Sequence, residues 1–367
     1  MSDGILPLEA EIRRLIARAG PMPVSEYMSL CLAHPQHGYY ITHDPLGSAG
    51  DFTTAPEISQ IFGELIGLWA AATWRQMGAP ENVRLVELGP GRGTMMRDAL
   101  RAAAVVPGFH NALVVHMVEI SPALQARQRR TLGQAGVPML WHASLDEVPP
   151  GPLIVLANEF FDALPIHQAV KQDDGWHERM VAVDSVGNFA FTTGPDAIPL
   201  FDKAVPHALR DALEGDIFEW RPDRPALELG RRIVREKGAA LVIDYGHAQS
   251  ALGDTLQAVG AHSFADPLST PGMIDLTAHV DFDALAQAAE SIGATAYGPL
   301  DQGEFLWRLG LEMRASALKR HATQSQIYDI DAAVIRLTAG GRDGMGRLFK
   351  VLALGHPSLG ELTGFET

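Results

Sequence analysis

The chain has 367 residues and a formal net charge of −15, with 47% hydrophobic and 20% charged residues. These values are typical of a globular protein with an ample core, and they exclude extensive disorder. An acidic surface repels nucleic acid and anionic lipid, so we expect no nucleic-acid partner, whereas a basic protein would be attracted.

The cysteine content and the N-terminal stretch bear on metals, membranes and compartment. Cys31 is the only cysteine, which excludes an internal disulfide and a multi-cysteine metal site. His262 and His279 are too far apart in the sequence to indicate metal ligands, so we predict no metal. The N-terminal stretch carries early acidic residues, unlike a secretory signal or a transit peptide. Because no apolar run approaches ~20 residues, we expect a cytoplasmic protein without a membrane span.

The N-terminal part, residues 1–77, is predicted to be helical. Apolar residues recur at helical spacing in 6–19, in 24–31 and again in 58–77. A glycine-rich polar loop, 44–57, separates the second of these helices from the third. Long loops of this kind are often lids or binding segments, and an ordinary surface loop is the alternative. We interpret this part of the chain as a helical and lid segment.

A short apolar strand, 85–88, is followed by a glycine turn and a helix. The turn contains Gly89, Gly91 and Gly93, and the helix begins at Thr94. Glycine lets backbone N–H groups approach a ligand closely, and a helix N-terminus favours an anion. The dinucleotide fingerprint G-x-G-x-x-G has a sixth-position glycine where this chain has Thr94. The pattern predicts a ligand cradle, although a tight turn without a ligand is the alternative.

Acidic residues end the first two predicted core strands. Glu87 lies two residues before Gly89, and a buried carboxylate there needs a partner such as a ligand ammonium group. Glu119 follows the apolar strand 112–118, where an acid can accept two hydrogen bonds from a ribose diol. The pattern resembles the S-adenosylmethionine site of class I methyltransferases more than an NAD site. The resemblance implies that the glycine turn holds the methionine end and Glu119 the ribose, with Asp146 or a neighbour near the adenine.

A more specific resemblance is carried by motifs that occur in this order: PQHGYY, GDFTTAPEIS, VELGPGRGTMMRDAL, LANEFFDALP, LVIDYGH, DLTAHVDF and GMGRLFKVLAL. Together they resemble the MidA family of class I methyltransferases, from about Pro21 to Leu354. The mitochondrial member of that family is a complex I assembly factor that methylates arginine in a complex I core subunit. The resemblance implies S-adenosyl-L-methionine as cofactor and a protein substrate, a subunit of respiratory complex I.

The apolar strand 153–157 is followed by Asn158, Glu159 and, three residues later, Asp162. In a doubly wound sheet the carboxyl ends of the strands form the active crevice. To methylate a guanidinium, the enzyme must hold that planar cation in line, and carboxylates grip it in a bidentate fork. Glu159 and Asp162 are therefore candidate catalytic residues, with Asn158 orienting a substrate nitrogen. A helix start with acids at its dipole is the alternative for the two acids, and a turn cap for Asn158.

The predicted secondary structure changes more than once in the remainder of the chain. Residues 166–200 alternate and turn like an antiparallel meander, which predicts a β-rich insertion. Residues 206–237 are expected to be mainly helical, and 253–340 to form a loop and helical excursion. Asp244 and Tyr245 end a further buried strand, where they either line the substrate channel or close a turn. Helices are also predicted at 282–292, 305–320 and 327–338, with strands at 239–243, 294–297 and within 344–354.

These elements predict an α/β fold, a Rossmann-like class I methyltransferase core at 78–367 with a mainly parallel, doubly wound sheet. An N-terminal helical lid and the β-rich insertion complete it. Two alternative functions stay open: a NAD(P)-dependent oxidoreductase, against which Thr94 counts, and a non-catalytic assembly or binding factor. The sequence does not give the oligomeric state, for which a homodimer is one candidate. The predicted cofactor-binding residues are Glu87, Gly89, Gly91, Gly93 and Glu119.

Overall fold

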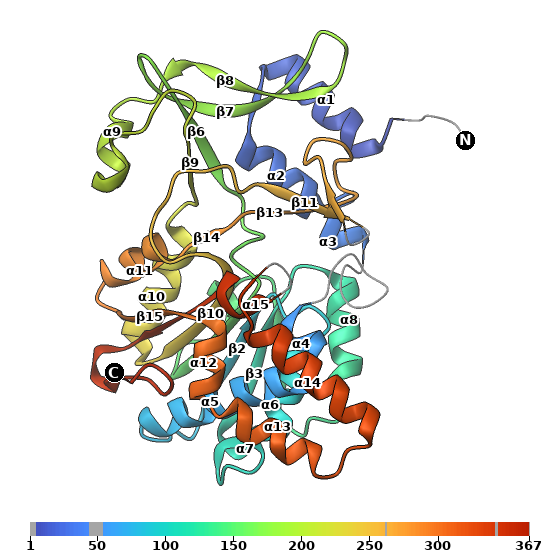
Figure 1. Cartoon of the computed structure of the whole chain (residues 1–367), viewed down its shortest axis with the longest axis vertical. Helices are drawn as coiled ribbons and strands as arrows, with labels where there is room; N and C mark the ends of the chain where they lie inside the picture. The colour runs from blue at the N-terminus through green and yellow to red at the C-terminus, as the bar shows by residue number, and fades with distance from the viewer. Residues whose placement is uncertain (1–4, 44–53, 261–262, 342–343, 367) are drawn as a thin grey trace. The chain divides into compact units, whose positions relative to one another are not determined.

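The computed structural model describes residues 5–43, 54–260, 263–341 and 344–366 (Figure 1). The chain forms two compact units, each assembled from separate segments. Most of the predicted loop 44–57 lies outside the described residues. Unit 1 consists of Met1–Phe52, Asp162–Pro222 and Gln249–Asp281, and unit 2 of Thr53–Phe161, Asp223–Ala248 and Phe282–Thr367.

The core of unit 2 is a mixed sheet in which most neighbouring strands run parallel. Every residue of the central strand Leu153–Asn158 is buried, so helices or loops cover both faces of that strand. One strand near an edge, Phe349–Gly355, runs antiparallel to both of its neighbours. The strand order is β15 (Thr295–Asp301), β16 (Phe349–Gly355), β10 (Ala239–His247), β5 (Leu153–Asn158), β2 (Val83–Leu88), β3 (Leu113–Val118) and β4 (Met139–His142).

The helices of unit 2 bury apolar stripes against this sheet and against one another. Helices α5 (Gln60–Gln76) and α6 (Thr94–Ala103) pack closely at Gly67, which has no side chain. A Cβ at this position would lie only 2.3 Å from the carbonyl oxygen of Ala99. Close packing fixes the helix that starts at the glycine turn. The other helices are α4 (Ala55–Ile58), α7 (Phe109–Ala112), α8 (Pro122–Thr131), α10 (Arg224–Glu236), α11 (Phe282–Glu290), α12 (Gln302–Arg308), α13 (Leu311–Lys319), α14 (Gln324–Thr338) and α15 (Met345–Leu348).

Unit 1 combines N-terminal helices with two antiparallel sheets. Its main apolar core includes Leu8 and Ile12 from the first helix, Met28 from the second, and Val181 from the larger sheet. The sheet residues therefore complete the core that the helices begin. The elements are α1 (Pro7–Ala19), β1 (Met22–Pro23), α2 (Val24–Ala33), α3 (Tyr39–Thr42), β6 (His167–Gln172), β7 (Gly175–Val183), β8 (Phe189–Ala197), α9 (Phe201–Ala204), β9 (Ile217–Trp220), β11 (Gln257–Gly260), β12 (Ser263–Ala265), β13 (Asp275–Thr277) and β14 (Val280–Asp281).

The predicted α/β sheet and its flanking elements are confirmed. The strand, glycine turn and helix between Arg84 and Arg101 appear as β2 and α6, and the strand before Glu119 as β3. The predicted meander in 166–200 is present as β6, β7 and β8, paired antiparallel. The apolar runs were short and bounded by glycine or acids, which made the strands recognisable.

Other expectations were wrong in detail. Residues 206–237 contain the strand β9 as well as α10, because Phe218 is buried in an aromatic cluster with Trp176 and Phe201 rather than on a helix stripe. The predicted helix 305–320 is divided into α12 and α13 at Gly310, whose φ is +89°. The short strands β11, β12 and β13 occupy a stretch expected to be loop.

The expected boundary between residues 77 and 78 does not separate the compact units. Helix α5 lies before that boundary, yet it belongs to unit 2, because it packs on α6 and on the core of the parallel sheet. Helices α1 and α2 belong to unit 1. A lid function for the N-terminal segment stays a prediction.

Candidate functional site

The turn after β2 has a shape that depends on its glycines. Gly89, Gly91 and Gly93 have φ values of +59°, +52° and +78°, in the region that L side chains rarely adopt. A Cβ at Gly89 would also lie 3.0 Å from Cδ2 of Phe160. Helix α6 begins at the next residue, Thr94, so its N-terminal N–H groups lie at this turn. The glycines leave main-chain groups accessible to a ligand.

Glu87 brings a carboxyl group to this turn from inside the sheet. It is 3% exposed, and its Oε2 has no hydrogen-bond partner among the residues that the structure describes. Burial raises the pKa of this carboxyl to about 8. A buried oxygen without a partner is costly, and a cationic group of a ligand would satisfy it. Glu87 therefore fits the cationic methionine end of S-adenosyl-L-methionine.

Glu119 follows β3 and is held by neighbouring groups. Its Oε1 accepts a hydrogen bond from the N–H of Ser121 at 2.8 Å, and its Oε2 accepts one from Nε2 of Gln128 at 3.1 Å. Burial raises the pKa of Glu119. Each carboxylate oxygen retains a further lone pair, so the group fits a ribose diol while its orientation is fixed.

Gln128 is a site residue that sequence reasoning missed. Besides Glu119, its Nε2 donates to the carbonyl oxygen of Gly91 at 2.8 Å, and its Oε1 accepts from Nε1 of Trp141 at 2.9 Å. Gln128 therefore joins the glycine turn, the end of β3 and β4. A buried glutamine in the helix after Glu119 was the available signal, but helix spacing alone does not show what its amide contacts.

Glu159 lies directly after β5 in a strained backbone conformation. Its φ is +49°, which is uncommon for a residue with a side chain. Its N–H donates to the carbonyl oxygen of Ile243 at 2.9 Å. Its Oε1 accepts from Nδ2 of Asn158 at 3.2 Å and from the N–H of Ala55 at 3.3 Å. Asn158 Oδ1 is buried and makes no hydrogen bond within the described part of the chain. The structure thus brings Asn158 and Glu159 together.

Asp244, within β10, holds this second turn in place. Its Oδ2 accepts from the N–H groups of Phe160 and Phe161 at 3.2 and 3.0 Å, and its Oδ1 accepts from the N–H of Tyr245 at 2.9 Å. The side chain is fully buried. The strand that Asp244 was expected to end continues to His247, so Asp244 closes no turn of its own strand, and lining of a substrate channel stays a prediction.

Asp162 and Asp146 are placed differently from the residues above. Asp162 is the first residue of its segment of unit 1, where its carbonyl oxygen accepts from the N–H of Ala278 at 3.1 Å and from Nη2 of Arg221 at 3.2 Å. Its grouping with Glu159 stays a prediction. Asp146 is exposed and hydrogen-bonds Glu228 on α10, whose pKa is raised to about 7 by burial and by this contact. A contact of Asp146 with adenine stays a prediction.

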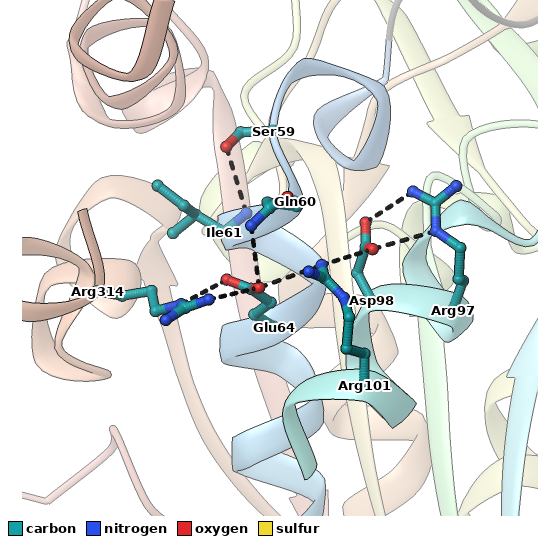
Figure 2. A network of polar contacts seen from close by, with 8 residues as sticks. All are labelled: Ser59, Gln60, Ile61, Glu64, Arg97, Asp98, Arg101 and Arg314. Atoms are coloured by element: carbon teal, nitrogen blue, oxygen red, sulfur yellow. Dashed lines mark hydrogen bonds and ion pairs between the residues drawn. The ribbon is translucent and has the colours of Figure 1, made fainter. Parts of the chain in front are cut away.

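An ion network around the buried carboxylates of Glu64 and Asp98 supports α6 (Figure 2). Glu64 on α5 is 1% exposed, and it accepts from Nε and Nη2 of Arg314 at 2.6 and 2.8 Å. Arg101 of α6 lies 3.1 Å from Glu64 and 2.8 Å from Asp98, and Asp98 also accepts from Arg97. The network joins α5, α6 and α13, so it fixes the helix that the glycine turn starts.

Two further findings concern metal sites and membrane-spanning helices. Within the ranges that the structure covers, no three His, Cys, Asp or Glu side chains come together as a metal site would require. Over the same ranges no helix combines the length and apolarity that crossing a bilayer needs.

Comparison with known proteins identifies close relatives. A sequence model described as S-adenosyl-L-methionine-dependent methyltransferase matches residues 65–300. The Drosophila melanogaster protein arginine methyltransferase NDUFAF7 homolog, mitochondrial, is 38% identical over 377 residues, covering 95% of this chain and 84% of its own. The Homo sapiens protein arginine methyltransferase NDUFAF7, mitochondrial, is 37% identical over 343 residues, covering 86% and 76%.

The fold also matches a solved structure. A Burkholderia thailandensis protein crystallised with S-adenosyl-homocysteine superposes with a TM-score of 0.80 and 30% sequence identity. The superposition covers 98% of this chain and 92% of that protein. The match extends over both units, so the mixed α/β architecture is shared in full.

The relatives correct one expectation from the sequence. The named proteins from Drosophila melanogaster, Xenopus tropicalis and Homo sapiens are mitochondrial. The expectation of a cytoplasmic protein is therefore wrong. It depended on the N-terminal residues lacking a targeting pattern, and such a lack does not decide a compartment.

Proposed function

The chain belongs to the family of S-adenosyl-L-methionine-dependent methyltransferases, and from this premise we propose that it methylates an arginine side chain of a protein. Family membership overturns the alternative of a NAD(P)-dependent oxidoreductase. The single observation that carries the proposal is Glu159, a carboxylate in a strained turn beside the glycine turn, in a chain whose relatives are named protein arginine methyltransferases.

The cofactor-binding roles follow from the geometry of the first turn. The main-chain groups of Gly89, Gly91 and Gly93 would hold the methionine end, with Glu87 facing its positive charge. The carboxylate of Glu119 would accept the ribose hydroxyls. When bound, S-adenosyl-L-methionine supplies an electrophilic methyl group on a sulfonium. The protein groups named here bind and orient it.

The acceptor roles follow from the second turn. A guanidinium is planar and cationic, so a carboxylate fixes both its position and its orientation. The Glu159 carboxylate, oriented by Asn158 and Ala55, is suited to hold the guanidinium. It is also suited to accept the proton that the nitrogen loses on methylation. Asp162 would add a second carboxylate. The buried Oδ1 of Asn158 would accept a hydrogen bond from a guanidinium N–H.

The substrate and assembly state are finer proposals. The resemblance to the MidA family favours an arginine in a subunit of respiratory complex I, and the net charge of −15 favours a basic segment around that arginine. A homodimer is proposed for the free protein, and light scattering on the purified chain tests it.

Isotope-labelled S-adenosyl-L-methionine tests the proposed function. The full chain is incubated with it and a cell extract, and modified residues are found by mass spectrometry. We expect labelled arginine with the wild type and with Gly187→Val, a control at another positive-φ glycine, which lies in a turn of unit 1. Gly91→Val should abolish both cofactor binding and labelling. Glu159→Gln should keep cofactor binding and lose at least about 100-fold in labelling.

The outcomes separate the alternatives. A wild type that binds the cofactor and labels lysine or a small molecule would contradict the arginine proposal. A Gly91→Val variant that keeps its cellular role without binding the cofactor would favour the non-catalytic assembly factor. A Glu159→Gln variant with wild-type labelling would remove Glu159 from the acceptor site.

A further inference from the structure

Helix α4 contacts both candidate turns although it has only four residues. Its first residue, Ala55, is fully buried, and its N–H donates to Oε1 of Glu159 at 3.3 Å. Its third residue, Glu57, accepts a hydrogen bond through Oε1 from Oγ1 of Thr94 at 2.6 Å. Thr94 is the first residue of α6. One turn of helix therefore touches the acceptor carboxylate and the cofactor helix.

The bond between Thr94 and Glu57 is of a strong kind. A hydroxyl donating to a carboxylate at 2.5–2.7 Å is a charge-assisted hydrogen bond. Glu57 also lies within the field of Arg97, whose pKa is raised mainly by its bond to Asp98 and further by Glu57. Two groups of α6 thus attract the same carboxylate.

The two ends of this contact are not equally fixed. Helix α6 is held by the ion network of Glu64, Asp98 and Arg101 shown in Figure 2. Neither helix has a side-chain cap on its N-terminus, but α4 is a single turn of four residues, whereas α6 has ten residues and this network. The fixed hydroxyl of Thr94 is therefore in a position to hold α4, rather than the reverse.

We propose that Glu57 and Thr94 are positioning residues for methyl transfer: their hydrogen bond holds α4 on α6, and α4 holds the Glu159 carboxylate through the N–H of Ala55. The start of α6 is thereby linked to the geometry of the acceptor carboxylate. The proposal rests on the proposed function for its catalytic meaning, and on contacts within unit 2 for its structure. It also gives a role to the threonine that replaces the third fingerprint glycine.

Hydrogen–deuterium exchange of the full chain tests the coupling without an acceptor. Thr94→Val removes the hydroxyl at nearly constant volume, and Thr94→Ser is the matched control that keeps it. We expect amides in residues 54–58 to exchange about tenfold faster in Thr94→Val, because a hydrogen bond to a charged group is lost. Thr94→Ser should exchange like the wild type, and the melting temperature reports whether each variant is folded.

Binding and labelling give the functional readouts. Affinity for S-adenosyl-homocysteine, measured calorimetrically, should stay within about threefold in Thr94→Val, while arginine labelling falls about tenfold. Thr94→Ser should restore labelling. The loss in the double variant Glu57→Gln with Thr94→Val should be smaller than the sum of the two single losses, because both changes break the same bond.

Specific results would overturn the coupling. Unchanged exchange in residues 54–58 of Thr94→Val, additive losses in the double variant, or a parallel fall in S-adenosyl-homocysteine affinity would each do so. A wild type that binds S-adenosyl-homocysteine but labels no arginine contradicts the proposed function instead. The exchange measurements then still decide whether Thr94 holds α4.

Discussion

The turn after β2 and the turn after β5 occupy neighbouring strand ends of one sheet, yet they are shaped in different ways. The first takes its positive φ values from glycines, which adopt them at no steric cost. The second has a glutamate at φ +49°, held by Ala55 from early in the chain and by Asp244 from β10. The first turn is thus a local property of its residues, and the second depends on distant contacts.

This difference has a chemical counterpart. Glu87, beside the first turn, is buried with an oxygen that no described group satisfies, which suits a site completed by a ligand. Glu159, in the second turn, already has protein donors on Oε1. Under the proposed function, a cationic ligand would complete the first turn, whereas protein donors already orient the carboxylate of the second.

The largest effect is expected from Asp244→Asn, which attacks only the second turn. The asparagine amide would face a main-chain N–H where a carboxylate now accepts, so we expect a loss of about 2–4 kcal/mol in the free energy of unfolding. Urea denaturation measures it, with the exposed Asp223→Asn at the start of α10 as control. Arginine labelling should fall further than S-adenosyl-homocysteine affinity, and equal losses would contradict the separate support of the two turns.

A smaller effect is expected from Arg314→Met, which weakens the support of α6. Glu64 would keep Arg101 and lose its two bonds to Arg314, whose side chain is 35% exposed. We therefore expect about 1–3 kcal/mol of destabilisation by urea denaturation, below the range for fully buried pairs. Because α6 starts at the first turn, cofactor affinity and labelling should fall together. A fall in labelling alone would connect this network to the second turn.

Taken per pH unit, the smallest effect is a pH dependence that belongs to Glu87. Its pKa is raised from 4.5 to about 8, so between these values the folded protein binds more protons than the unfolded chain. Stability should therefore fall as pH rises through this window, by at most about 1.4 kcal/mol per pH unit. Melting temperatures of the ligand-free protein from pH 5 to 8 measure the slope, and Glu87→Gln should flatten it.

The same group gives the opposite slope for binding. A cationic ligand favours the carboxylate form, so S-adenosyl-L-methionine affinity should rise with pH up to about 8. Calorimetry in buffers of different ionisation heat would detect the proton released on binding. An affinity that does not vary with pH, or that falls, would show that Glu87 does not face the cofactor charge.

The contrast between the turns also explains what could be predicted from the sequence. Apolar runs ending in an acid or glycine predicted β2, β3 and β5, and the spacing of the three glycines predicted the first turn. Asn158 and Glu159 were located, but the backbone strain at Glu159 and the donor Ala55 were not. The contact joins residues 104 positions apart, and local spacing carries no information about it.

The prediction for residues 206–237 was wrong for a related reason. Phe218 packs on Trp176 and Phe201 in unit 1, so β9 is set by sheet and aromatic neighbours far away in the sequence. The same holds for Gln128 and Asp244, whose residue types are ordinary while their partners are specific. Composition and periodicity are properties of a single segment, whereas these roles depend on contacts between two segments that are distant in the sequence.

The interleaving of the two units has a consequence for synthesis. Unit 1 receives its final segment by Asp281, whereas the sheet of unit 2 lacks β16 until Gly355 has been made. In the finished sheet β16 pairs with β10 on one side and β15 on the other, so a nascent chain short of it exposes the edge of β10. We expect ribosome-bound chains ending before Phe349 to be sensitive to protease and to recruit chaperones. All of unit 1 has therefore been made before unit 2 can complete its sheet.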